Sequence, residues 1–196
     1  MKRSLPKFLF LFYFLFYFFF LHSGQLEPEK VRGTPLCMNS FKWLFNASRY
    51  PVKPYDTAQK FDHATNNHII VLRKNRFFLV PLADTTGQEY TAAEIEIQLQ
   101  NIIAFAGSEA SPTPVGALTS DNRDIWADAR EALLAASPSG KNAELLRKIE
   151  GAMIILALDD TNPVTRKEIS WSTWVGDGRN RWYDKHQRKP YLFLVF

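Results

Sequence analysis

The chain has 196 residues, of which 46% are hydrophobic and 22% charged, and its net charge is +4. The length suits one domain or part of a larger protein, and the composition excludes a collagen-like, disulfide-stapled or wholly disordered chain. Seven basic and three acidic residues lie between positions 166 and 189. Because this stretch contains no Lys/Arg run, we interpret it as a solvated surface and expect no nucleic-acid partner. The single cysteine, Cys37, excludes an intramolecular disulfide and is typical of a reducing compartment.

Residues 1–24 form a hydrophobic N-terminal segment that is rich in Phe. Three basic residues precede an unbroken apolar run of 14 residues, which begins at Phe8 and ends at Leu21. This order is the outline of a signal peptide, although a membrane span needs about 20 residues and no Ala-x-Ala cleavage pattern follows. Three interpretations stay open: a signal or membrane anchor, a part of the fold, or a gene-model artefact, since thymine-rich tracts encode Phe, Leu and Tyr.

The next segment predicts a helix followed by an irregular connection. Thr34 and Pro35 suit the N-cap and the first position of a helix, and apolar residues follow at roughly helical spacing. Pro51 ends this predicted helix, and residues 51–67 are rich in turn-forming residues. An N-glycosylation sequon begins at Asn46, inside the predicted helix, and we treat it as a chance match.

A β-hairpin is predicted next. Residues 68–73 and 76–82 are β-rich runs, and Lys74 and Asn75 between them form the turn. Pro81 has no backbone N–H to donate, so the end of the second run belongs at a sheet edge or a strand terminus.

Thr91 and Glu94 form a capping box, which predicts the start of a helix that ends near Gly107. One apolar face of this helix is expected to point inward. It comprises Ile95, Leu99, Ile102, Ile103 and Ala106.

A polar loop is predicted over 108–120, and two helices are predicted over 121–136 and 142–150. The inward side of the first of these helices comprises Ile125, Trp126, Ala129, Leu133 and Leu134. Residues 152–158 are apolar throughout and predict a strand that is buried on both faces. A last helix is predicted from Asn162-Pro163 toward Trp174. Together these elements predict an α/β fold (α+β mixed), with a short sheet made of a hairpin and a buried strand, flanked by helices.

Several possible sites are weighed and set aside. Gly176-x-Gly178 resembles the start of a dinucleotide fingerprint, but Arg181 stands where the third glycine belongs, and the segment follows a helix. Asp159-Asp160 is more typical of a loop at a strand end than of a metal site. Cys37 and the histidines show no metal-ligand spacing, and we therefore expect no metal. The histidines are His22, His63, His68 and His186.

The densest polar stretch runs from Asp177 to Lys185 and surrounds Trp182 with charged residues. We interpret its Arg181 and Asp184 as holding the geometry of the loop rather than doing chemistry.

At this loop the sequence resembles the choline/carnitine acyltransferase family, and most closely its fungal carnitine O-acetyltransferases. The similar segments follow the family order over about residues 25–185. They are residues 33–46 (GTPLCMNSFKWLFN), 51–54 (PVKP), 67–78 (NHIIVLRKNRFF), 114–126 (PVGALTSDNRDIW), 158–160 (LDD) and 176–185 (GDGRNRWYDK).

The resemblance implies a reversible acyl transfer between acyl-CoA and carnitine, in which coenzyme A is a substrate and no cofactor is bound tightly. It implies a catalytic His that acts as general base on the carnitine hydroxyl. It further implies two similar α/β domains with the active site between them, and a mitochondrial or peroxisomal enzyme.

The chain also departs from the family pattern. The family's catalytic His lies downstream of the motif that ends here at Lys185, and His186 lacks the family's sequence context. We therefore assign no catalytic residue. We divide the chain into the hydrophobic N-terminal segment 1–24, a partial acyltransferase domain over 25–185 and a divergent tail over 186–196. We expect a fragment that is inactive alone. Two alternatives stay open. They are a non-catalytic binding or regulatory module, and a membrane-anchored or secreted protein that uses the run from Phe8 to Leu21.

Overall fold

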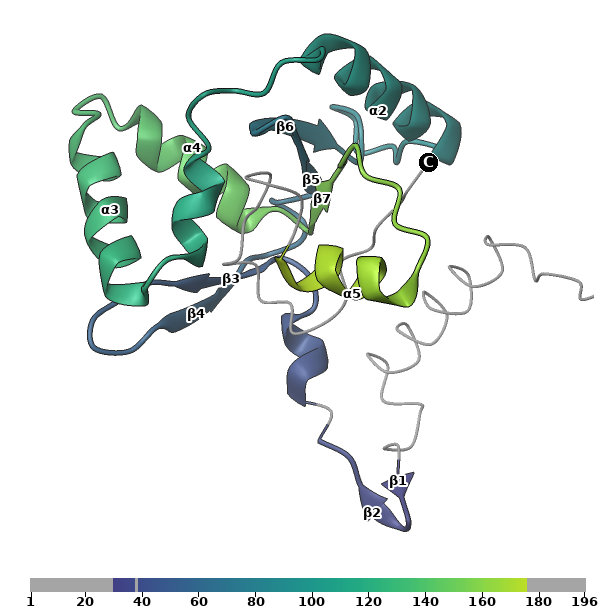
Figure 1. The fold of residues 1–196 in the computed structure, drawn as a ribbon, viewed down its shortest axis with the longest axis vertical. Helices are drawn as coiled ribbons and strands as arrows, with labels where there is room; N and C mark the ends of the chain where they lie inside the picture. Colours follow the sequence, from purple (N-terminus) through teal and green to yellow (C-terminus); the bar gives the residue numbers. More distant parts are fainter. Residues whose placement is uncertain (1–29, 38, 176–196) are drawn as a thin grey trace, which may run out of the picture. The chain divides into compact units, whose positions relative to one another are not determined.

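The structure is a computed structural model that describes residues 30–37 and 39–175 (Figure 1). The chain divides into two units, Met1–Phe41 and Lys42–Phe196. In the first unit, β1 (Lys30–Val31) and β2 (Thr34–Pro35) pair antiparallel. Arg32 and Gly33 between them have φ values of 51° and 83°, and this left-handed turn reverses the chain. The 3₁₀-helix η1 (Asn39–Trp43) spans the boundary between the units.

The second unit contains a three-stranded sheet in the order β6-β5-β7. Strands β5 (His68–Arg73) and β6 (Arg76–Pro81) form an antiparallel hairpin, and β7 (Ile155–Ala157) pairs parallel with β5. Lys74 and Asn75 form the turn with φ values of 50° and 60°, as a two-residue hairpin loop requires. The predicted hairpin is confirmed, and β6 is an edge strand among the described strands.

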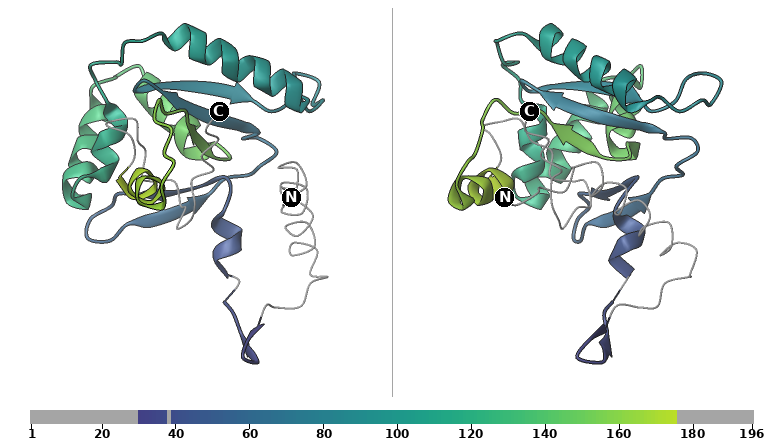
Figure 2. Two further views of the ribbon diagram at one scale, coloured as in Figure 1. Left: turned by 45° about the vertical axis from the view of Figure 1, so that its right-hand side comes forward. Right: turned by 90° about the vertical axis from the view of Figure 1, so that its right-hand side faces the viewer.

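Helices cover both faces of this sheet (Figures 1 and 2). Helix α2 (Ala92–Ala106) packs on one face, and helices α3 (Arg123–Ala135) and α4 (Lys141–Gly151) pack on the other. The α2-side cluster is built on the buried residues Ile69, Val71, Val80, Leu99, Leu156 and Leu158. The α3/α4-side cluster is built on Trp126 and Leu146, against which Phe77 and Ile155 pack. Helices on both faces of a mixed sheet confirm the predicted α/β fold class.

A second antiparallel hairpin joins β3 (Ala47–Tyr50) to β4 (Thr57–Lys60). The predicted helix from Thr34 is therefore wrong, and so is the wholly irregular connection over 51–67. Asn46 has a φ of 47°, which ends helical geometry immediately before β3. Its backbone N–H donates to the Met153 carbonyl at 3.1 Å, which fixes the start of the hairpin next to the strand region of β7.

The capping box is confirmed, since the Thr91 hydroxyl accepts from the Glu94 N–H and the Glu94 carboxylate accepts from the Thr91 N–H. Ile103 and Ile125, both predicted to face inward, are exposed at 39% and 53%. The 3₁₀-helix η2 (Val115–Ser120) lies in the predicted polar loop. Strand β7 is shorter than the predicted run, and helix α5 (Arg166–Val175) begins later than predicted.

Candidate functional site

Two of the segments that carry the family resemblance meet at the carboxyl ends of the parallel strands β5 and β7. Arg73, the last residue of β5, pairs its Nη2 with Asp160 Oδ1 at 2.6 Å and donates from Nη1 to the Leu158 carbonyl at 3.0 Å. Lys74 also pairs with Asp160. Hydrogen bonding from Lys74 is the main cause that holds the pKa of Asp160 below its ordinary value, and Arg73 acts in the same direction. We call Arg73, Lys74 and Asp160 the carboxyl-end cluster.

The carboxyl-end cluster links the ends of β5 and β7 through ion pairs and one hydrogen bond. Its single carboxylate is shared by two cations, and Asp160 is therefore an ion-pair partner. Within residues 30–37 and 39–175, no group of three or more His, Cys, Asp or Glu side chains is arranged to hold a metal ion.

A second polar cluster surrounds a buried carboxylate. Glu150, in the last turn of α4, has a side chain that is only 7% exposed. Its Oε1 accepts from Arg130 Nη2 at 2.8 Å and Nε at 3.1 Å, and its Oε2 accepts from the Tyr50 hydroxyl at 2.7 Å. The guanidinium of Arg130 also lies 4.9 Å from the centre of the Tyr50 ring. We call Tyr50, Arg130 and Glu150 the Glu150 cluster.

The Glu150 cluster joins three elements, because Tyr50 ends β3, Arg130 lies in α3 and Glu150 lies in α4. Ser48 adds a 2.7 Å bond from its hydroxyl to the Glu150 carbonyl. Burial raises the pKa of the Tyr50 hydroxyl far above its ordinary value, and the hydrogen bond to Glu150 adds to the rise. Tyr50 therefore stays protonated and donates to the carboxylate.

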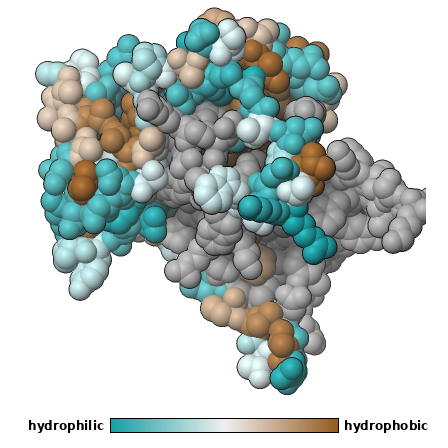
Figure 3. All heavy atoms as spheres, viewed as in Figure 1, coloured by the Kyte–Doolittle hydropathy of each residue, from teal (hydrophilic) through white to brown (hydrophobic). Residues whose placement is uncertain are grey.

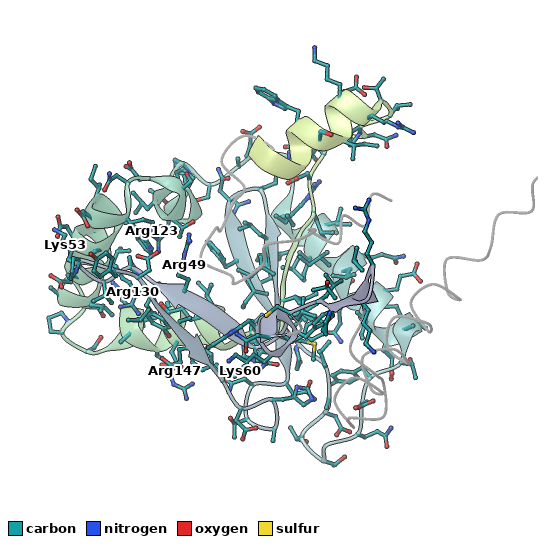
Figure 4. The ribbon with its side chains drawn as sticks, turned by 90° about the horizontal axis from the view of Figure 1, so that it is seen from below. Arg49, Lys53, Lys60, Arg123, Arg130 and Arg147 are labelled. Carbon is teal, nitrogen blue, oxygen red and sulfur yellow. The ribbon has the colours of Figure 1, made fainter. Side chains whose placement is uncertain are left out.

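Arg130 is one of six cations labelled in Figure 4 that lie in the β3–β4 hairpin or in helices α3 and α4. Asp56 pairs with Arg49 at 3.2 Å and with Arg123 at 2.8 Å, and Lys53 pairs with Asp128 at 2.6 Å. Lys60 instead donates to the Phe45 carbonyl, and Arg147 lies over the Phe61 ring. Because Arg123 and Lys53 pair with carboxylates across the two elements, we interpret these ion pairs as attaching the hairpin to α3.

The described ranges contain two histidines, His63 and His68. The Nε2 of His68 lies 2.8 Å from the Lys148 carbonyl, to which it donates, so this ring is held between β5 and α4. His63 is exposed in the turn before β5. Cys37 is exposed as well.

The other candidates lie outside the described residues. They are the apolar run from Phe8 to Leu21, His22, Gly176, Gly178, Arg181, Trp182, Asp184 and His186. Within the part of the chain that the structure describes, no helix is both long enough and apolar enough to cross a membrane.

Sequence reasoning missed the Glu150 cluster. Glu150 and Arg130 both fall in correctly predicted helices, but their partner Tyr50 fell at the end of the predicted helix that Pro51 closes, rather than in a strand. A signal was present, since Tyr50 ends a short run before two prolines, and such a run also suits a strand.

A family model and two curated proteins that match this chain all concern carnitine acyltransferases. The family model described as choline/carnitine O-acyltransferase matches residues 11–188. Human mitochondrial carnitine O-palmitoyltransferase 2 is 37% identical over 155 residues, which are 79% of this chain and 22% of that protein. Mitochondrial carnitine O-acetyltransferase of Saccharomyces cerevisiae is 36% identical over 166 residues, covering 82% of this chain and 24% of that protein.

A highly reducing polyketide synthase of Aspergillus luteorubrus is 34% identical over 166 residues, which are 84% of this chain and 5% of the synthase. The chain therefore spans less than a quarter of the length of each of these three relatives. Since the family model covers most of the 196 residues, the chain belongs to the choline/carnitine O-acyltransferase family.

Proposed function

We propose that this chain is part of an acyltransferase that moves acyl groups between coenzyme A and carnitine. The observation that carries the proposal is the family match over residues 11–188. The names of two relatives, a carnitine O-palmitoyltransferase and a carnitine O-acetyltransferase, give carnitine as the acceptor. Because the two relatives match at 37% and 36%, the proposal covers the acyl-CoA class and no particular chain length.

We further propose that the 196 residues do not catalyse the transfer alone. A carnitine hydroxyl attacks a thioester only when a base within hydrogen-bond reach takes its proton. His68 donates to the Lys148 carbonyl, and His63 lies in an exposed turn. The described portion thus supports a scaffold role, with the catalytic base supplied by another part of a longer enzyme.

The proposed compartment is the mitochondrion, with the peroxisome as the alternative. Support comes from two relatives whose names include "mitochondrial". Organelle fractionation of the source cells with an antibody against residues 120–140 tests this. Recovery of the protein in a secretory fraction would contradict it and would favour a signal in the run from Phe8 to Leu21.

The activity test uses acetyl-CoA and palmitoyl-CoA with carnitine, and a thiol reagent that detects released coenzyme A. The 196-residue chain is expected to release none above background. The longer enzyme encoded at the same locus is expected to release it with at least one of the two substrates. If the longer enzyme is inactive with both, the acyltransfer proposal fails. If the short chain turns over, the scaffold proposal fails, and His186→Ala then tests whether His186 is the base.

A further inference from the structure

The side chain of Lys60, the last residue of β4, carries a further inference (Figure 4). We propose that, among the lysines of residues 30–37 and 39–175, Lys60 is the one that acyl-CoA thioesters modify most readily, by direct acylation of its amine. This reaction uses neither carnitine nor a catalytic residue. It therefore does not depend on the proposed function.

The acylation is a simple displacement on a thioester. A lysine reacts only as the neutral amine, because the ammonium has no free electron pair. The nitrogen forms a bond to the acyl carbonyl carbon, the carbon–sulfur bond breaks, and coenzyme A leaves as its thiol with the proton that the nitrogen loses. The product is a neutral amide. The reactivity of a lysine thus depends on how easily it gives up a proton and on how well the thioester can reach it.

The hydrogen-bond partner of Lys60 is compatible with the neutral amine. Its Nζ donates to the Phe45 carbonyl at 2.6 Å, and no carboxylate of the described residues pairs with it. A carbonyl oxygen accepts from an amine N–H as well as from an ammonium N–H, so loss of the proton breaks no ion pair. Partial burial of the group also lowers the pKa of Lys60 below its ordinary value.

The backbone holds this side chain in place and leaves it accessible. Lys60 pairs with Ala47 in the β3–β4 ladder, and the next N–H, that of Phe61, donates to the Asn46 carbonyl at 2.7 Å. These bonds fix the strand end beside the Phe45 carbonyl. All four residues of β4 are exposed, so a thioester can reach the amine from solvent.

Three other lysines of the described ranges have a carboxylate partner that favours the charged form. The pairs are Lys53–Asp128 at 2.6 Å, Lys148–Glu144 at 2.7 Å and Lys74–Asp160. The hydrogen bond to Asp128 raises the pKa of Lys53, which is the opposite direction to that of Lys60. Lys42 lies 5.2 Å from the centre of the Trp43 ring, and this contact likewise favours the cation.

The exposed apolar side chains elsewhere carry no comparable inference. On the face seen in Figure 3, apolar residues of α2 and α3 lie among hydrophilic ones. Phe105, the most exposed of those on α2, contacts Phe78 edge-to-face with ring centres 6.1 Å apart. Isolated apolar residues of this kind are usual on a protein surface.

The first test incubates the 196-residue chain with acetyl-CoA in the absence of carnitine and measures the acetylation rate of each lysine by mass spectrometry. The exposed Lys141 and Lys167 are the reference sites. Lys60 is expected to react at least about 3-fold faster than either, because a lower pKa increases the amine fraction more than it reduces nucleophilicity.

The control repeats the reaction in concentrated guanidinium chloride, which removes the Phe45 contact and the partial burial. The three rates are then expected to become similar. Equal rates in the folded chain, or the same preference for Lys60 in the unfolded chain, would overturn the proposal. Because carnitine is absent, either result leaves the acyl-transfer proposal unaffected, and each proposal can fail alone.

The second test uses two substitutions on the same surface. Lys60→Arg keeps the charge and a donor for the Phe45 carbonyl, and it is expected to remove the fastest acetylation while Lys141 and Lys167 react as before. Asp128→Asn, at a side chain that is 67% exposed, leaves Lys53 without its carboxylate, and acetylation of Lys53 is expected to rise. Unchanged early acetylation in Lys60→Arg would reject Lys60 as the preferred site. An unchanged rate at Lys53 in Asp128→Asn would overturn the argument that carboxylate pairing protects the other lysines.

Discussion

Helix α2 and the β3–β4 hairpin are attached to their neighbours by different forces, although apolar clusters cover both faces of the sheet. On the α2 side, six buried aliphatic residues form a continuous cluster, and the helix begins at a side-chain cap. The β3–β4 hairpin, in contrast, is attached to α3 and α4 through the Glu150 cluster and through the Arg123–Asp56 and Lys53–Asp128 pairs. The first attachment is apolar and non-directional, whereas the second depends on a few charged groups with fixed geometry.

This difference determines how each side responds to change. An apolar cluster accepts residues of similar size with small losses of stability. A buried charge whose partner is removed has no such tolerance, because it stays desolvated and unpaired. Four substitutions test this contrast, and they follow in order of expected effect.

The largest effect is expected for Glu150→Ala. It leaves Arg130, whose side chain is only 19% exposed, without its carboxylate, and unfolding free energy should fall by about 3–5 kcal/mol. The matched control is Glu144→Ala on the same helix, where the Lys148 pair is open to solvent and little change is expected. Urea denaturation measures both variants. Equal losses in the two would show that the Glu150 cluster contributes no more than a surface pair.

Leu99→Ala tests the apolar side. Leu99 is 6% exposed within the α2-side cluster, and the resulting cavity should cost about 2–5 kcal/mol. Leu99→Met keeps the volume and should cost less than about 1.5 kcal/mol. Ile97→Ala, at a position on the same helix that is 57% exposed, serves as the control and should have little effect. Similar losses for Met and Ala at position 99 would contradict the tolerance expected of this side.

Thr91→Ala removes the cap of α2 and should lower the unfolding free energy by about 1 kcal/mol. The capping hydroxyl satisfies the Glu94 N–H, which would otherwise lack a partner at the start of the helix. Thr85→Ala, in the exposed loop before the helix, is the control. Thermal denaturation followed by circular dichroism compares the two. A larger loss for Thr85 would show that the cap is not the stabilising feature.

The smallest effect is expected for Asp160→Asn, and it should depend on pH. The pKa of Asp160 is lowered in the folded state by Lys74 and Arg73, so the ionised carboxylate stabilises the fold above the ordinary Asp pKa of about 3.9. This stability is lost as the pH falls through the folded-state pKa. At pH 7 the variant should be less stable by about 1 kcal/mol or less, because Asp160 is 47% exposed. Denaturation at pH 7 and at pH 2–3 measures the gap, and a gap that stays constant with pH would refute the role of the ion pairs.

Elements with strong local signals were predictable. The capping box at Thr91 and Glu94 indicated where α2 begins. Lys74-Asn75 indicated the hairpin turn because it lies between two β-rich runs, and because Asn adopts the positive φ of such a turn more readily than most residues. These signals act over two to four residues and do not depend on the rest of the fold.

The β3–β4 hairpin was mispredicted because its local pattern is ambiguous. Apolar residues before Asn46 continue at helical spacing, and the partner strand Thr57–Lys60 is exposed and polar, so it shows no alternation. Ala47–Tyr50 is a strand because it pairs with Thr57–Lys60, and side-chain bonds from Ser48 and Tyr50 to the distant Glu150 hold it against α4.

The polar clusters were beyond sequence reasoning for the same reason. Tyr50 is 100 residues from Glu150 along the chain, and Arg73 is 85 residues from the Leu158 carbonyl that it binds. The family resemblance identified the segments containing Arg73 and Asp160, but their pairing follows from the parallel arrangement of β5 and β7.

The side-chain amide of Asn46 has a consequence for how folding of this chain can be followed. It is 2% exposed and donates both its hydrogens, to the Asn66 carbonyl at 2.9 Å and to the Gly151 carbonyl at 3.0 Å. An N-linked sugar would replace one of these hydrogens and could not fit in the folded chain. Glycosylation at this sequon and the native fold therefore exclude each other. In a version routed through a glycosylating compartment, the fraction of chains that gains sugar mass at Asn46 would count the molecules that had not yet folded.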